Sequence, residues 1–130
     1  MPHYPYYFDS TGSPTPLYKL TKEFAYDRKA AISYILYANN KYLELVDTIL
    51  AHSARPPVIL LISDHGFGEI KEDKDKKTMF LNLNAIFFPG RDYSGVYPGI
   101  SNVNLFRLVL NKHFGQQLPL LKDSTIYLTD

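Results

Sequence analysis

The sequence predicts an α/β fold with a parallel sheet at its centre. A long helical pattern of apolar residues precedes a continuous run of Val, Ile and Leu at residues 58–62. A second apolar run follows at residues 80–88, and a second helical pattern comes after it. A strand whose residues are all apolar is typical of a sheet covered on both faces, which is the usual state of a parallel sheet. We therefore expect helices packed against a buried sheet.

Composition limits the possible classes of protein. The chain has 130 residues, of which 45% are hydrophobic and 21% charged, as in an ordinary globular domain with one core. A net charge of +1 gives no field that would attract nucleic acid, so we expect no nucleic-acid partner. The absence of cysteine excludes disulfides, thiolate metal sites and a cysteine nucleophile within these 130 residues. The longest apolar run is far shorter than the ~20 residues that a membrane helix needs, so any membrane contact is expected through segments outside this sequence.

The N-terminal half contains a loop followed by a long helix. Four prolines interrupt residues 1–20, which predicts a loop. Residues 24–52 contain neither Pro nor Gly, and their apolar residues recur at spacings of three and four, which predicts one long helix. Pro56 and Pro57 lie beyond its end.

The second half contains two predicted strands, a helix and a last strand. Residues 58–62 and 80–88 are the two strands, and the mixed charges of residues 71–77 between them predict a solvated loop. Ser101 is a good N-cap and Gly115 a good C-terminal stop for the helix between them. Residues 125–129 predict a final short strand. This order is typical of the last part of a layered α/β domain rather than of a complete one.

Asp64 and His65 stand where the first predicted strand ends, followed by Gly66. Ligands of open parallel sheets bind outside the carboxyl ends of the strands. A carboxylate oxygen and a neutral imidazole nitrogen suit a divalent ion such as Zn²⁺ or Mn²⁺, and glycine permits a sharp turn beside them. The alternative is an ordinary turn in which Asp64 caps the local backbone. These residues taken alone leave both interpretations open.

Several segments together resemble one family. They are "PHYPYYFDSTG", "ISDHG", "LNLNAIFFPG", and "ISNVNLFRLVLNKHFG" followed by "LPLL". In this order they are similar to successive blocks in the C-terminal half of sulfatase-like proteins of the alkaline phosphatase superfamily. The resemblance implies that residues 1–130 are one partial domain, the C-terminal part of an α/β/α sandwich with a largely parallel sheet. Residues 1–20 would form a substrate-side loop, and residues 21–130 the α/β core.

The resemblance also implies an activity and a site. The family acts on sulfate or phosphate esters through bound metal, so the expected function is a metal-dependent hydrolase of these esters. Asp64 and His65 match the family's metal ligands, and one divalent ion (Mn, Zn, Mg or Ca) is expected. His3 matches a catalytic histidine that faces the transferred group. The nucleophile and the remaining ligands are expected upstream of Met1, so this chain alone should be inactive.

Two alternatives stay open at this point. One is a membrane-anchored transferase of the phosphoethanolamine or glycerophosphate type, since ester hydrolysis and group transfer share such a site. Relatives imply a location outside the cytoplasm or anchored to a membrane. The other alternative is a non-catalytic structural or partner-binding half-domain. Its expected partner is the N-terminal half of the same domain or a second copy of the chain, because an incomplete sheet leaves an exposed edge.

Overall fold

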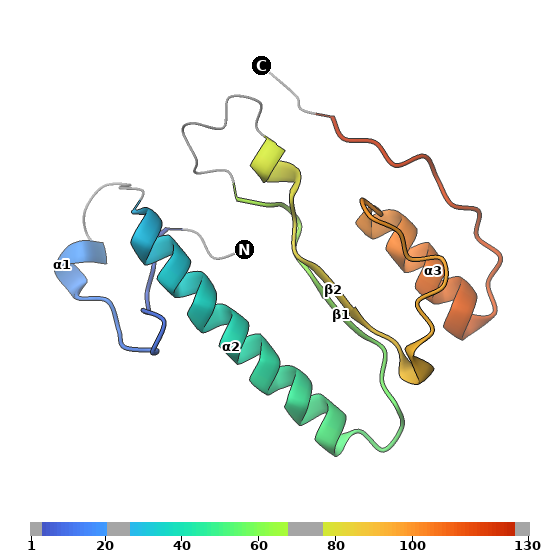
Figure 1. Cartoon of the computed structure of the whole chain (residues 1–130), viewed down its shortest axis with the longest axis horizontal. Coiled ribbons are helices and arrows are strands. Elements are labelled where there is room, and N and C mark those ends of the chain that lie inside the picture. Colours follow the sequence, from blue (N-terminus) through green and yellow to red (C-terminus); the bar gives the residue numbers. More distant parts are fainter. Residues whose placement is uncertain (1–3, 21–26, 68–76, 127–130) are drawn as a thin grey trace.

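The computed structural model describes residues 4–20, 27–67 and 77–126. Within these residues the chain forms two long helices, one short helix, two strands and two 3-10 turns (Figure 1). In chain order these are α1 (Leu17–Leu20), α2 (Arg28–His52), β1 (Ile59–Ile62), η1 (Lys77–Phe80), β2 (Asn84–Phe87), η2 (Pro89–Arg91) and α3 (Asn102–Phe114). No helix of the described residues is long and apolar enough to cross a membrane.

Both long helices begin and end where local chemistry favours it. The side chain of Asp27 accepts hydrogen bonds from the N–H groups of Lys29 and Ala30 and so caps α2. Ser101 caps α3 by accepting from the N–H of Asn104. Gly115 ends α3 in the left-handed conformation at φ 65°, which glycine adopts without strain. The predicted helix after Ser101 is confirmed, and so is the predicted long helix from residue 28 onward.

The parallel sheet predicted from the sequence is wrong. β1 and β2 pair antiparallel, with Ile59 opposite Phe87 and Ile62 opposite Asn84. They form a sheet of two strands, the only one among the described residues. The described architecture is therefore not the C-terminal part of an α/β/α sandwich with a largely parallel sheet.

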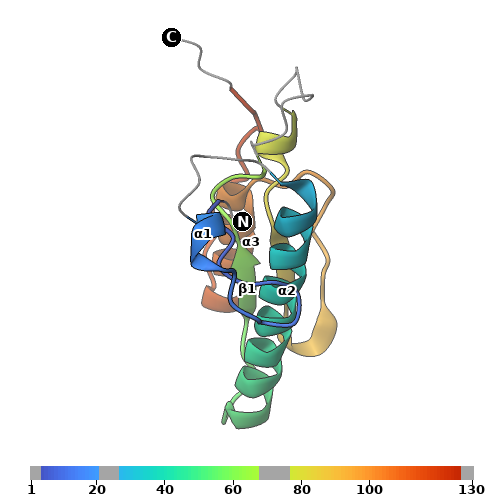
Figure 2. The same cartoon turned by 90° about the vertical axis from the view of Figure 1, so that its left-hand side faces the viewer.

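The error has a physical reason. Helices do flank the sheet, since α2 lies on one side and α3 on the other (Figures 1 and 2), and β1 is buried at Ile59 and half-buried at its other three residues. Cover by helices, however, does not decide the direction of the neighbouring strand. A parallel neighbour needs a crossover that carries the chain back along the sheet, usually a helix of a dozen or more residues. The described part of the connection from β1 to β2 contains only the single turn η1.

The second and third predicted strands differ as well. β2 covers only Asn84–Phe87 of the predicted range 80–88, because Phe80 belongs to the 3-10 turn η1. In the expected strand at 125–129, Thr125 and Ile126 have no strand structure, and the other positions lie outside the described residues.

The core lies between the sheet and α3. Phe88 and Leu105 are fully buried, and Ile100, Leu108 and Val109 complete the buried cluster. Alternate residues of the two strands pack against this cluster, namely Leu60, Ile62 and Ile86. On the other side of the sheet, α2 keeps an apolar stripe exposed that includes Leu36 (51% exposed) and Leu43 (63%).

An extended segment follows α3 and runs back along it (Figure 1). Two asparagines of α3 hold its backbone: Asn111 exchanges two hydrogen bonds with Leu118, and Asn104 does the same with Leu121. Asn104 is fully buried and also donates to Asp123 at 2.9 Å. The segment is therefore fixed by side-chain amides of α3 and not by strand pairing.

The N-terminal segment packs against the first part of α2. Phe8 pairs with Pro14 in an isolated bridge, and the ring of Phe8 lies 5.1 Å from that of Tyr37. The N–H of Ser10 donates to Ser33 Oγ at 2.7 Å. The described part of the predicted loop at residues 1–20 is irregular except for the single turn α1.

Candidate metal centre

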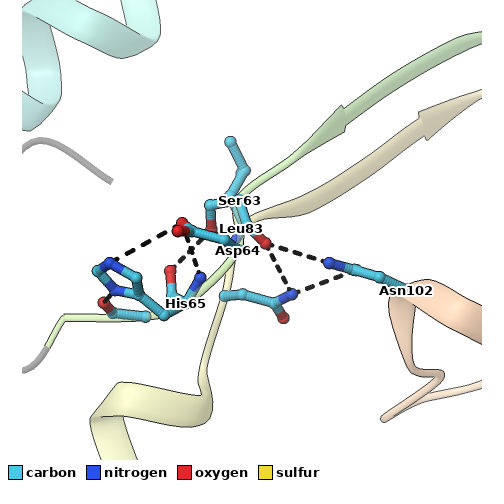
Figure 3. Close-up of polar contacts among 7 residues, drawn as sticks. Ser63, Asp64, His65, Leu83 and Asn102 are labelled. Atoms are coloured by element: carbon cyan, nitrogen blue, oxygen red, sulfur yellow. Dashed lines mark hydrogen bonds and ion pairs between the residues drawn. The ribbon is translucent and has the colours of Figure 1, made fainter.

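Ser63 is the last residue held by the sheet before the candidate site (Figure 3). Its N–H donates to the carbonyl of Leu83 at 3.0 Å, and its Oγ accepts from the N–H of Leu83 at 2.8 Å. The same hydroxyl donates to the carbonyl of His65 at 2.9 Å. Ser63 therefore extends the strand pairing by one residue through its side chain and links it to the turn that follows.

The carbonyl of Ser63 accepts hydrogen bonds from two side-chain amides. Asn82 and Asn102 each donate to it at 3.1 Å, and Asn82 also donates to Asn102 Oδ1 at 3.2 Å. Asn82 precedes β2 and Asn102 begins α3, so two other segments meet the end of β1 here (Figure 3).

Gly66 is required by a close approach of two backbone segments. It is buried, and its N–H donates to the carbonyl of Met79 at 2.6 Å, while the N–H of Phe67 donates to that of Thr78 at 2.9 Å. A Cβ added at Gly66 would lie 2.0 Å from the carbonyl oxygen of Thr78. Gly66 therefore serves to admit η1 close to the chain, in addition to the sharp turn expected from the sequence.

Asp64 and His65 themselves are exposed, with 85% and 55% of their side chains accessible. Asp64 Oδ1 accepts from the N–H of His65 at 3.0 Å. This hydrogen bond is the main reason why the pKa of Asp64 is below its ordinary value. The carboxylate is therefore ionised at neutral pH.

The ring of His65 has a defined tautomer when neutral. Its Nδ1 lies 2.7 Å from the carbonyl oxygen of Gly66. A carbonyl oxygen can only accept, so Nδ1 carries the hydrogen and Nε2 carries the lone pair. Nε2 lies 3.8 Å from Asp64 Oδ1. The geometry thus brings a nitrogen lone pair and a carboxylate oxygen to the same side of the turn.

This pair comes close to the spacing of two ligands of one divalent ion. Metal bonds to histidine nitrogen and carboxylate oxygen are about 2.0–2.2 Å for Zn²⁺, so two ligands of a tetrahedral ion lie about 3.4 Å apart, a few tenths of an ångström closer than His65 Nε2 and Asp64 Oδ1 lie here. Histidine ligands usually donate their second ring N–H to a carboxylate, a backbone carbonyl or water, and His65 donates its own to the carbonyl of Gly66. If Asp64 were only a local cap, the hydrogen bond from the N–H of His65 to its carboxylate would be sufficient. The second hydrogen bond, from Nδ1 of His65 to the carbonyl of Gly66, orients the ring and is not needed for a cap.

The pair supplies two ligands. Among the residues that the structure describes, no group of three or more His, Cys, Asp or Glu side chains could hold a metal ion. A third His, Asp or Glu ligand of a complete site would have to come from outside this part of the chain.

A hollow of about 860 Å³ opens beside Asp64 and His65. Its other walls include Asn84, Asn102 and Asp123. The Oδ1 atom of Asn84 is buried and has no hydrogen-bond partner among the described residues. The size falls within the range of ordinary small-molecule sites, and the walls offer amide and carboxylate groups to a polar ligand.

The other residues considered from the sequence lie elsewhere. His3 lies outside the described residues. The neighbouring loop, from Tyr4 onward, lines a separate hollow of about 590 Å³ with the first turns of α2. The Nδ1 of His52 lies 2.9 Å from the carbonyl oxygen of Thr48 at the end of α2, and the ring of His113 packs 5.3 Å from that of Phe88. Neither histidine lines the hollow beside Asp64 and His65.

Sequence reasoning missed Asn82 and Asn102. Both occur in segments that carry the family resemblance, but asparagine before a strand or at a helix start is commonplace. They are 19 and 39 residues from Ser63, and no local pattern indicates contacts at such separations.

Comparison with known proteins adds no relative: no protein-family model, curated protein or solved structure matches the chain significantly.

Proposed function

We propose that this chain supplies part of the metal site of an enzyme that hydrolyses sulfate or phosphate esters. The observation that carries the proposal is the paired orientation of Asp64 and His65. The Nδ1–H group of His65 is held by the carbonyl of Gly66, which presents Nε2 within 3.8 Å of an ionised carboxylate. The resemblance of the quoted segments to sulfatase-like proteins supports the same chemistry.

The roles of the chain's own groups follow from their charges. Asp64 and His65 would hold one divalent ion, which neutralises charge on ester oxygens and lowers the pKa of an attacking hydroxyl. The adjoining hollow would receive the organic part of the ester, where amide groups can meet its polar atoms. His3 would contact the transferred group. The nucleophile and the remaining ligands are assigned to residues outside the described part of the chain.

Hydrolysis and transfer differ in the acceptor, which is water in one case and an alcohol in the other. A transferase of the phosphoethanolamine or glycerophosphate type, located outside the cytoplasm or anchored to a membrane, would use the same two ligands. Hydrolysis is the reaction that we propose for this site, and transfer is the alternative.

Metal binding can be tested on the chain itself. Two ligands should bind Mn²⁺ only weakly, so we would titrate ¹⁵N-labelled protein with Mn²⁺ to millimolar concentration and follow amide line broadening. Broadening is expected to centre on Asp64, His65 and Gly66. The variants Asp64→Ala and His65→Ala should weaken it at least tenfold, whereas His52→Ala is a matched control that should leave it unchanged. Broadening that is absent from these amides, or that persists in both variants, would refute the assignment.

A partner-binding half-domain is the second candidate function. The observation in its favour is the exposed stripe of α2, which includes Leu36 and Leu43. Within the described residues β1 and β2 also pair only with each other, so each has an outer edge without a neighbouring strand. Exposed apolar surface and sheet edges of this kind favour association with another chain.

A further inference from the structure

We propose that Asn82 and Asn102 are positioning residues of the metal centre. By holding the carbonyl of Ser63, they fix the direction in which Asp64 and His65 leave the sheet. This inference rests on the proposed function, because it assigns a role towards the same two ligands.

The geometry is a closed set of three hydrogen bonds. Both amides donate to the oxygen of Ser63 at 3.1 Å, and Asn82 donates to Asn102 Oδ1 at 3.2 Å (Figure 3). The three residues come from the end of β1, the segment before β2 and the first turn of α3. The end of β1 is thereby tied to two elements that are distant in sequence.

The oxygen that they hold belongs to the peptide unit that leads into Asp64. A peptide unit is planar, so fixing its carbonyl also fixes the N–H of Asp64 and the start of its Cα bond. The other polar atoms of Ser63 are bound to Leu83 and His65. Rotation of this peptide unit is therefore opposed mainly by the two amides.

Within the described residues, the side chains of Asp64 and His65 make only local hydrogen bonds. The carboxylate of Asp64 bonds to the next residue, His65, whose ring in turn bonds to Gly66. These local contacts orient the two side chains relative to each other, but not relative to the rest of the protein. The long-range restraints act on either side of the pair, through the Ser63 carbonyl and through the N–H of Gly66 on Met79.

A purely structural role is the competing explanation, since the same bonds join α3 to the sheet. It predicts a loss of stability without a change in the ligands of the folded protein. The two explanations therefore differ in the order and the metal affinity of Asp64 and His65.

The test uses Asn82→Ala, Asn102→Ala and, as a matched control, Asn40→Ala on the exposed surface of α2. In the metal-free proteins, ¹⁵N relaxation should show the order parameters of the Asp64 and His65 amides falling from about 0.85 towards 0.6 in the first two variants only. Their Mn²⁺ affinity, measured well below the thermal midpoint, should fall about tenfold. If Asn102→Ala fails to fold, Asn82→Ala still removes one of the two bonds to Ser63.

Unchanged order together with unchanged affinity in the folded variants would overturn the inference, whatever their thermal midpoints. If the wild-type chain shows no Mn²⁺ broadening at Asp64 and His65, the proposed function fails. In that case the relaxation measurement still decides whether the two asparagines hold the turn.

Discussion

Replacing Gly66 with alanine should destabilise the fold through a steric clash. The new Cβ would lie 2.0 Å from the carbonyl oxygen of Thr78 and 2.7 Å from that of Leu81, whereas ordinary contacts begin at 3.4 Å. Both obstacles are backbone atoms, so no side chain can rotate away to make room. Either η1 moves by more than about 1 Å, or the pairing of residues 66–67 with residues 78–79 is lost.

The magnitude follows from these two effects. Inserting a methyl group into a packed site costs about 1–3 kcal/mol. Losing the hydrogen bonds that the N–H groups of Gly66 and Phe67 make would cost about 1 kcal/mol each. A loss of about 3 kcal/mol corresponds to a change of about 150-fold in the unfolding equilibrium constant.

Urea denaturation provides the measurement. With a slope of about 2 kcal/mol per M, the midpoint should fall by about 1.5 M. Gly115→Ala is the matched control: Gly115 has φ 65° and no atom within 4 Å of an added Cβ, so only the left-handed backbone is strained, at a cost of about 1 kcal/mol. If Gly66→Ala shifts the midpoint no more than Gly115→Ala does, the clash argument is wrong.

Four further outcomes are expected. Asn104→Ala should cost about 2 kcal/mol, about 1 kcal/mol for each of the two hydrogen bonds to Leu121, and should speed amide hydrogen exchange at Leu121, because the part-buried N–H and carbonyl of that residue lose their partner; unchanged exchange would contradict this. Hydrogen bonding by Ser101 is the main cause that lowers the pKa of Asp123 from 3.8 to about 2, so its stabilising effect is present above about pH 4 and is lost as the pH falls towards 2. Asp123→Asn should therefore flatten the acid side of the stability profile, and an equally steep profile would count against this role. The wild-type chain should associate in light scattering, and Leu43→Glu, on the exposed face of α2, should reduce association at an unchanged thermal midpoint; a monomeric wild type would refute a second copy of the chain as the partner. In the active enzyme, His3→Ala should lower turnover of an aryl sulfate or phosphate without lowering the thermal midpoint, and the opposite pattern would indicate a structural histidine.

The sequence was sufficient where the deciding contacts are local. Ser101 and Gly115 predict the two ends of the helix from Asn102 to Phe114, and each acts on backbone groups within a few residues of itself. The position of β1 also follows from its own residues, because an apolar run requires burial whatever covers it. Asp64 and His65 could be singled out for a related reason: ionisable groups at the end of a buried strand are visible in the order of the residues.

Only the tertiary structure decided which segments meet. The direction of pairing between β1 and β2 depends on the path of the chain between them, and the composition of a strand contains no information about that path. For the same reason the contacts of Ser63 with Asn82 and Asn102 could not be read from the sequence: a carbonyl oxygen accepts any suitable donor, and its partner is whichever segment the fold brings within reach. Gly66 combines both cases. The sequence indicates that a glycine is needed after Asp64 and His65, but only the structure shows the reason, which is the close approach of the backbone of η1 to residue 66.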